Sequence, residues 1–260
     1  MPLSEIVSLK RLREESYVGV LCYPRYEKKE AMRRIQELKR LDVKALEFIG
    51  EKTAFNMPIL GKGCVGIVVA ARIDGRRVAL KIRRVDAGRK GMEHEAEMLR
   101  RTNNINVGPQ VIEISDNFLV MEFFEGMLLP KWLETLKGRG TKNRIRQVLR
   151  DILEQCWKLD EIGLDHGELS RAPKHIIIGS DDKARIVDFE TASVQRRVSN
   201  LTSICQYLFI GSQTAKTIRW KLGKVNEKAL TTTLRNYKRN RTRENFDKVL
   251  SVCGLSNVKG

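Results

Sequence analysis

A glycine-rich stretch that runs directly into a hairpin constrains this chain more than any other feature. The stretch "GKGCVGIV" follows a G-x-G-x-x-G-x-V pattern formed by Gly61, Lys62, Gly63, Gly66 and Val68. The next residues include "RIDGRR" (72–77), an Asp-Gly turn signal between two apolar runs. A glycine pattern of the dinucleotide-binding type should lead into a helix, whereas this one leads into strand, turn and strand. The glycines are therefore expected to cap a hairpin, where bare backbone can approach phosphates.

The second strand of this hairpin separates its side chains onto two faces. In "VALKI", period-two alternation places Val78, Leu80 and Ile82 on one face and Ala79 and Lys81 on the other. Ala79 leaves room for a flat base, and Lys81 can reach phosphate oxygens.

A carboxylate on the following helix is the natural partner of that lysine. In "GMEHEAEML", the apolar stripe of Met92, Ala96 and Leu99 has helical spacing, and Glu95 falls inside it. A carboxylate on a buried face needs a cation, because an unpaired buried charge is costly. We therefore predict that Glu95 pairs with Lys81 and orients it; the alternative is a solvated Glu95 at the edge of the stripe.

Three further segments complete the pattern. An apolar strand in "FLVMEFFEGMLLP" (118–130) ends in Met121, Glu122 and Phe123, and suits a hinge between two lobes whose backbone groups bind adenine. The stretch "LDHGELSRAPKHIII" (164–178) contains Glu168, and "ARIVDFE" places Asp188 at the end of a strand.

Taken together, these features resemble the protein-kinase signature set in order and spacing, over about residues 58 to 190. The "HGEL" form, with glycine where typical kinases have arginine, is similar to RIO and related atypical kinases, and most of all to small archaeal serine/threonine kinases. No A-P-E follows Asp188, which leaves little room for a long activation loop. The resemblance implies an α+β, two-lobed kinase-like fold, with an antiparallel sheet and one helix in the N-lobe and a truncated, mainly helical C-lobe.

The resemblance also implies a cytoplasmic enzyme that uses ATP with Mg²⁺ or Mn²⁺. Lys81 would contact phosphates, Asp188 would hold the metal, and Glu168 would accept the proton from a Ser or Thr hydroxyl. The glycine loop, Ala79, Glu95 and the hinge residues would complete the nucleotide site.

The catalytic loop departs from the family pattern at two positions. Glu168 stands where the family has aspartate, and Pro173 stands where it has a metal-binding asparagine. His175 directly precedes the strand "IIIG", as that asparagine does, so it is the substitute metal ligand, and it would suit manganese better than magnesium. The alternative is a satisfied polar residue at a strand start. Lys174 or Arg171 could supply positive charge, and His166 is expected to brace the Asp188 turn.

We expect three parts along the chain: an N-terminal α/β extension (1–55) packed on the kinase domain, an N-lobe (56–125), and a C-lobe (126–260) without a long activation loop. Within the extension, "VGVLCY" (18–23) reads as a strand and 28–41 as a helix. Later helices are expected at about 199–210, 226–238 and 242–253.

The charge composition of the chain indicates which classes of partner it can attract. Lys and Arg total 49 against 32 Asp and Glu, a formal net charge of +17 that favours polyanionic partners such as RNA, DNA or acidic membrane surfaces without distinguishing among them. Two basic stretches, 28–40 and 235–248, are either solvated helix faces or a nucleic-acid footprint. No apolar run reaches membrane-spanning length, and the five scattered cysteines form no CxxC pair.

The sequence leaves the acceptor open. Besides a kinase acting on a protein of unknown identity, it is compatible with a nucleotide-binding pseudokinase on ribosomal or transfer RNA particles, with an ATPase switch, and with a small-molecule phosphotransferase.

Overall fold

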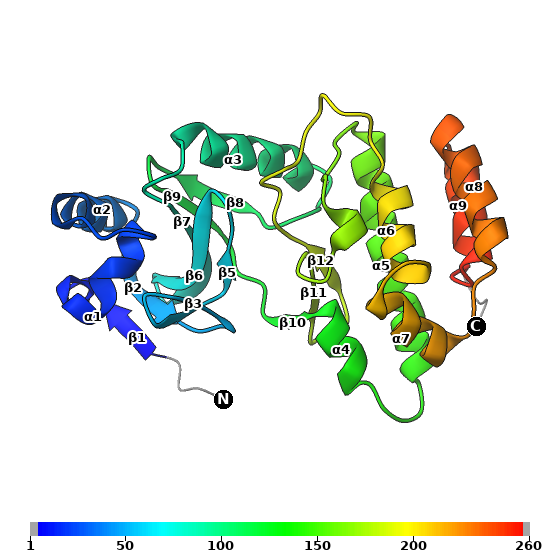
Figure 1. The fold of residues 1–260 in the computed structure, drawn as a ribbon, viewed down its shortest axis with the longest axis horizontal. Helices are drawn as coiled ribbons and strands as arrows, with labels where there is room; N and C mark the ends of the chain where they lie inside the picture. The colour runs from blue at the N-terminus through cyan, green and yellow to red at the C-terminus, as the bar shows by residue number, and fades with distance from the viewer. Residues whose placement is uncertain (1–4, 257–260) are drawn as a thin grey trace. The chain divides into compact units, whose positions relative to one another are not determined.

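The computed structural model describes residues 5–256, which form two compact units (Figure 1). Unit 1 holds the described residues up to 103 together with 109–123, and unit 2 holds 104–108 and the described residues from 124 onward. Unit 1 is built on an antiparallel sheet, and unit 2 is mainly helical. The predicted α+β kinase-like fold class is thereby confirmed.

The sheet of unit 1 has the strand order β1-β2-β6-β7-β9-β8, with β5 paired to β6 and a separate β3–β4 hairpin. The strands are β1 (Glu5–Ser8), β2 (Val43–Phe48), β3 (Lys52–Ala54), β4 (Met57–Ile59), β5 (Gly61–Lys62), β6 (Gly66–Ile73), β7 (Arg76–Arg83), β8 (Val111–Ile114) and β9 (Phe118–Glu122). Asp74 and Gly75, at the β6–β7 turn, have positive φ angles of 46° and 76°, as the predicted Asp-Gly turn requires.

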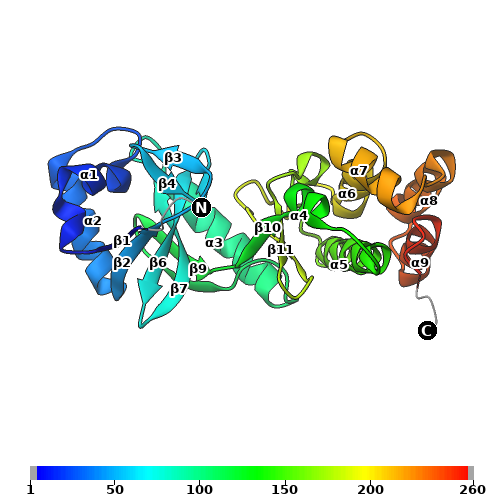
Figure 2. The same ribbon diagram turned by 90° about the horizontal axis from the view of Figure 1, so that it is seen from below.

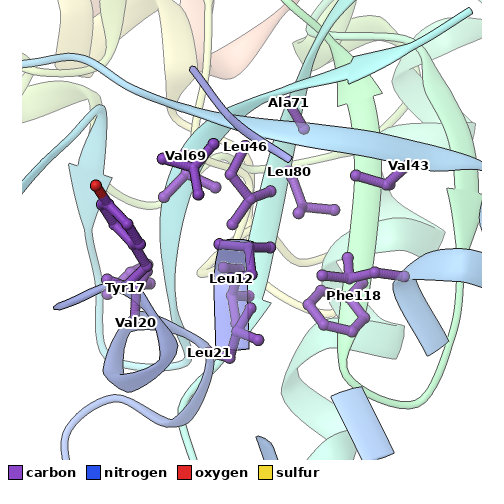
Figure 3. Close-up of a cluster of buried hydrophobic side chains, with 14 of the residues drawn as sticks. Leu12, Tyr17, Val20, Leu21, Val43, Leu46, Val69, Ala71, Leu80 and Phe118 are labelled. Atoms are coloured by element: carbon purple, nitrogen blue, oxygen red, sulfur yellow. The ribbon is translucent and has the colours of Figure 1, made fainter. Parts of the chain in front are cut away.

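The N-terminal segment covers one face of this sheet. It contains η1 (Arg11–Arg13), α1 (Glu15–Val18), η2 (Gly19–Cys22) and α2 (Lys28–Arg40). Figure 3 shows Leu12 and Leu21 of this segment packed with Leu80 and Phe118 of the sheet, all of them buried. Because side chains alternate along a strand, Lys81 points to the opposite face, where α3 (Arg89–Asn103) contacts β8 and β9. The sheet thus separates the hydrophobic core from the lysine.

The described residues of the segment, 5–55, are integral to unit 1, because β1 and β2 extend its sheet through the pairing of β2 with β6. The strand predicted at 18–23 is wrong: the end of α1 and the 3-10 helix η2 occupy these positions. Val18 to Cys22 are all buried, and a short run buried on every side has no periodicity that separates helix from strand.

The described part of unit 2 combines three short strands with six α-helices and one 3-10 helix; Figure 2 shows the arrangement of the strands and α-helices. The elements are β10 (Gly126–Leu128), α4 (Leu129–Thr135), α5 (Thr141–Glu161), η3 (Leu169–Arg171), β11 (Ile176–Gly179), β12 (Ala184–Ile186), α6 (Asn200–Phe209), α7 (Gln213–Leu222), α8 (Glu227–Arg239) and α9 (Arg243–Val252). Helices α6, α8 and α9 match the predicted ranges, whereas α7 was not predicted. None of the described helices combines the length and apolar character needed to cross a bilayer.

Candidate functional site

The glycine loop is the tip of the β5–β6 hairpin. Gly61 pairs with Val68, which pairs in turn with Lys81 on β7, so the loop leads directly to the lysine. A Cβ at Gly66 would lie 2.8 Å from the Ile82 carbonyl oxygen and 3.0 Å from Cγ of Lys81. Glycine at position 66 therefore allows β6 to pass close to the Lys81 side chain. Lys62, in the same loop, makes a cation–π contact, with its Nζ 4.5 Å from the ring centroid of Tyr23.

The predicted Lys81–Glu95 pair is present. Lys81 Nζ lies 2.5 Å from Glu95 Oε2, and both side chains are buried. Glu95 sits on α3 beside the buried Met92, Ala96 and Leu99, so the helical stripe carries the carboxylate to the sheet face that Lys81 occupies. Burial fixes the position of the ammonium, because leaving the pair would place an uncompensated charge in a region of low dielectric constant.

The predicted hinge coincides with the point where the chain passes from one unit to the other. Unit 1 ends at Phe123, and unit 2 resumes at Phe124. Met121 is buried and pairs with Ala79, whereas Glu122 is exposed and its backbone N–H donates to the Gln110 carbonyl oxygen (2.9 Å). The Glu122 N–H is thus already used within unit 1.

Unit 2 brings together the three remaining predicted residues. Ligand atoms of Glu168, His175 and Asp188 all lie within 4.8 Å of one another. His175 Nε2 is 2.9 Å from Glu168 Oε2, and His175 Nδ1 is 3.6 Å from Asp188 Oδ2. These residues come from the loop before η3, the start of β11 and the end of β12, so the β11–β12 hairpin assembles the cluster.

The His175 ring is the buried member of this cluster. It has no exposed surface, and neither ring nitrogen makes a hydrogen bond of acceptable geometry despite the close carboxylates. Burial lowers the pKa of His175, which keeps the imidazole neutral with one lone pair available. A buried polar atom without a partner calls for an explanation, and one neutral nitrogen with two carboxylates is a donor set that fits a divalent cation.

Lys174 supplies a positive charge at the same place. Its Nζ lies 3.8 Å from Glu168 Oε2 and 3.9 Å from Asp188 Oδ2. The lysine is more than half exposed (61%), so its ammonium can move away from the carboxylates when a cation or a phosphate approaches.

The Asp188 backbone is strained. Its φ angle is +70°, in the left-handed region that residues other than glycine seldom adopt. Phe189, directly after it, is fully buried, and its ring centroid lies 4.8 Å from that of His166. His166 Nε2 is also 3.1 Å from the Val187 carbonyl oxygen. These contacts agree with the predicted bracing role of His166 and hold the Asp188 carboxylate in the cluster.

The His166 ring gives the fold a specific pH dependence. Burial, followed by the neighbouring His175, lowers the pKa of His166 from 6.5 to about 4. Between pH 6.5 and about 4, the unfolded chain binds a proton at this position that the folded chain excludes. Stability should therefore be highest above this window and fall with decreasing pH by about 1.4 kcal/mol per pH unit from this group.

Urea unfolding in EDTA at several pH values measures this slope. We expect His166→Gln to flatten it and the control His94→Gln, on α3, to keep it; equal slopes for wild type and His166→Gln would contradict the assignment.

Glycine at position 167 is explained by packing and backbone conformation together. Its φ angle is +92°, and a Cβ there would lie 2.5 Å from Nη2 of Arg196. Arg196 in turn pairs with Asp165 (3.2 Å) and donates to the Thr191 carbonyl oxygen (2.6 Å). The glycine of "HGE" therefore leaves room for Arg196, from the segment after Asp188, to make these contacts beside the loop.

A buried hydrogen-bond network, which the sequence did not predict, anchors the loop that contains His166. The His166 backbone N–H donates to Asn200 Oδ1 (2.8 Å), and Asn200 Nδ2 donates to Asp160 Oδ1 (2.9 Å). Asp160 also accepts from the Tyr237 hydroxyl (3.0 Å). The network ties α5, α6 and α8 to the loop. No local signal identifies it, because its members are up to 77 residues apart.

Much of the charge in the two basic stretches has a structural use. Arg34, in 28–40, is fully buried and donates to the Leu21 carbonyl oxygen (2.6 Å) and to Asn117 Oδ1 (2.9 Å). In 235–248, Arg243 pairs with Glu154 and Lys248 with Glu244, both on the helical surface of unit 2. Arg34, Arg243 and Lys248 thus take part in packing and ion pairs.

A sequence model of the RIO domain matches residues 69–201, from β6 to the first turn of α6. The chain is 34% identical over 102 residues to the uncharacterized protein MJ1211 of Methanocaldococcus jannaschii, covering 39% of this chain and 83% of that protein. It is 31% identical over 135 residues to the KEOPS complex subunit Bud32 of Pyrococcus abyssi, covering 49% and 56%. It is 27% identical over 149 residues to a mouse protein named sperm motility kinase Tcr mutant form, covering 55% of this chain but 30% of that protein.

Proposed function

The chain belongs to the RIO domain family, which supports kinase- or ATPase-type activity, and we propose that it is an ATP-dependent kinase that phosphorylates a serine or threonine hydroxyl. The observation that carries the proposal is the convergence of Glu168, His175 and Asp188 around one buried imidazole. Two carboxylates held together against electrostatic repulsion, one of them on a strained backbone, are a costly arrangement that a structural role does not explain.

In unit 1, the proposed role of Lys81 is to bind phosphate oxygens of ATP. The buried Glu95 carboxylate holds the ammonium in place, so that no conformational search is needed when the nucleotide binds. Gly66 supports the same role, since any side chain there would displace Lys81. The backbone of the glycine loop is expected to approach the phosphates, as the sequence predicts.

In unit 2, the proposed role of Glu168 is that of general base. Its side chain is 37% exposed, so an acceptor hydroxyl can reach it, and one of its carboxylate oxygens lies 2.9 Å from His175 Nε2. The other oxygen is left to accept the proton from the hydroxyl. Lys174 lies close enough to offset negative charge that builds up near Glu168 and Asp188.

A divalent metal would be held by Asp188 and His175, with Glu168 close to both. When bound, the ion would neutralise charge on the phosphate oxygens of ATP. The mixed nitrogen and oxygen donor set suits Mn²⁺ better than Mg²⁺, which prefers oxygen ligands alone.

The test is an assay with ATP radiolabelled at the γ-phosphate, in the presence of Mg²⁺ or Mn²⁺, that reads phosphoprotein and free phosphate together. We expect label on serine or threonine, with more transfer in Mn²⁺ than in Mg²⁺. Asp188→Asn should lower transfer and should also weaken binding of Mn²⁺ alone, measured by electron paramagnetic resonance without nucleotide. The matched control is Asp181→Asn, an exposed aspartate in the β11–β12 turn.

Two outcomes would contradict the proposal. Free phosphate released without phosphoprotein would identify an ATPase instead. ATP binding without turnover in either metal would identify a pseudokinase.

A further inference from the structure

The most exposed large hydrophobic side chain in the described part of the chain is Trp220, on the last turns of α7. Its exposed fraction is 81%. The opposite side of α7 is formed by Thr214, Ala215 and Ile218, which are buried and attach the helix to unit 2 without the indole. Trp220 is therefore not needed for the core, and an indole is the largest flat surface that a side chain can present to a ligand.

A basic hollow of about 600 Å³ lies beside this indole. Its lining includes Lys137, Lys142 and Lys221 together with Trp220, and no aspartate or glutamate lines it in the part of the chain that the structure describes. Lys221 Nζ is 5.1 Å from the indole ring centroid and donates to the Leu136 carbonyl oxygen (3.0 Å). One lysine is thus fixed against the ring, while Lys137 and Lys142 are exposed.

Two glycines in the turn before α5 line the hollow without placing a side chain in it. Gly138 and Gly140 have φ angles of +82° and +85°, and a Cβ at either would meet nothing within 4 Å. The space in the hollow next to both glycines is therefore open.

We propose that this hollow, the Trp220 hollow, binds a single-stranded nucleic acid, with one base stacked on the Trp220 indole and neighbouring phosphates on Lys137 and Lys142. A π face next to cations without an acidic neighbour is the combination that single-stranded nucleic acids require. The formal net charge of +17 attracts the same class of polyanion over longer distances.

Two other partners fit less well. A lipid surface needs a broad apolar face, but the other exposed large apolar side chains of the described chain lie outside α7 and the 136–143 turn. An acidic protein would match the lysines, but it would not require an isolated, flat aromatic surface. The inference does not rest on the proposed kinase activity, because it concerns no residue of the Glu168 cluster.

The experiment titrates the full chain with end-labelled oligouridine and oligodeoxythymidine of about twelve nucleotides, in the absence of ATP, and reads fluorescence anisotropy. We expect Trp220→Ala to weaken binding at least about tenfold and Trp220→Phe to keep most of the affinity, because a smaller ring still stacks. Lys142→Ala should weaken binding and reduce the slope of log affinity against log salt by about one.

Two control variants distinguish binding at the Trp220 hollow from nonspecific binding to the basic surface and from an effect of the Glu168 cluster. Tyr26→Ala removes another exposed aromatic residue, next to the basic helix α2, and should leave affinity unchanged, as should Glu168→Gln. Trp220-dependent binding of either oligonucleotide supports the proposal, and a preference for RNA or for DNA identifies the source. Unchanged affinity of Trp220→Ala would overturn it, and so would Trp220-dependent binding to phosphatidylserine vesicles or polyglutamate with none to either oligonucleotide.

Discussion

Replacing Glu168 with glutamine is expected to lower the rate of phosphate transfer by about a hundredfold to ten-thousandfold, the usual contribution of a general base. Glutamine keeps the length and polarity of the side chain but cannot accept a proton. ATP binding should change little, because Lys81 and the glycine loop belong to unit 1 and are untouched. Single-turnover measurement of label transfer, with nucleotide affinity measured in parallel, checks both expectations.

The matched control for this variant is Glu161→Gln, an exposed glutamate in the last turn of α5. Its transfer rate should equal that of the wild type. If Glu168→Gln also transfers phosphate at the wild-type rate, Glu168 is not the base. Glu168→Asp provides a second comparison: it restores the residue of typical kinases but withdraws the carboxylate from His175 Nε2, 2.9 Å away. A misplacement of about 1 Å can cost about a hundredfold, so we expect this variant to be impaired as well.

Replacing Lys81 with methionine is expected to lower the free energy of unfolding of unit 1 by about 3–5 kcal/mol, since it removes the cation next to a buried carboxylate. Glu95→Leu should have a similar cost. The double variant Lys81→Met/Glu95→Leu replaces both charges with apolar groups of similar size and should recover most of the stability, but none of the phosphate transfer.

The measurement must follow unit 1 itself. All three tryptophans, Trp132, Trp157 and Trp220, lie in unit 2, so tryptophan fluorescence does not follow unit 1, and hydrogen exchange in β7 and α3 is the suitable probe. Lys90→Met, an exposed lysine on α3, is the control and should unfold like the wild type. Wild-type stability of Lys81→Met would show that the pair contributes nothing to the fold. Recovery of transfer in the double variant would remove Lys81 from the proposed mechanism.

The Glu168→Gln and Lys81→Met variants are expected to differ in stability although both lose catalysis. The Lys81–Glu95 pair is expected to stabilise the fold and, in the proposed mechanism, to position a phosphate-binding group, whereas the Glu168 cluster brings like charges together and therefore costs stability. A chain that loses catalysis through Glu168→Gln should be at least as stable as the wild type, because one carboxylate charge is removed from the cluster. A chain that loses catalysis through Lys81→Met should be less stable.

The sequence by itself determined the features that depend on local periodicity and turn chemistry. Alternation along "VALKI" separated Leu80 from Lys81, helical spacing placed Glu95 on the buried face, and the Asp-Gly turn distinguished a hairpin from a dinucleotide-binding unit. Each of these signals lies within a few residues of the chain. The order of the motifs along the chain is likewise read directly from the sequence, and the RIO family match confirms the resemblance that this order indicated.

Tertiary structure decided whatever depends on residues far apart in the chain. Only the pairing of β2 with β6 joins β1 and β2 to the rest of the sheet, and only packing on all sides makes Val18 to Cys22 helical. The burial of His175 without hydrogen bonds, the strained Asp188 and the exposure of Trp220 likewise follow from neighbours that no local pattern names. The physical reason is that periodicity records which face of an element is apolar, whereas burial and charge pairing depend on what the rest of the chain places against that face.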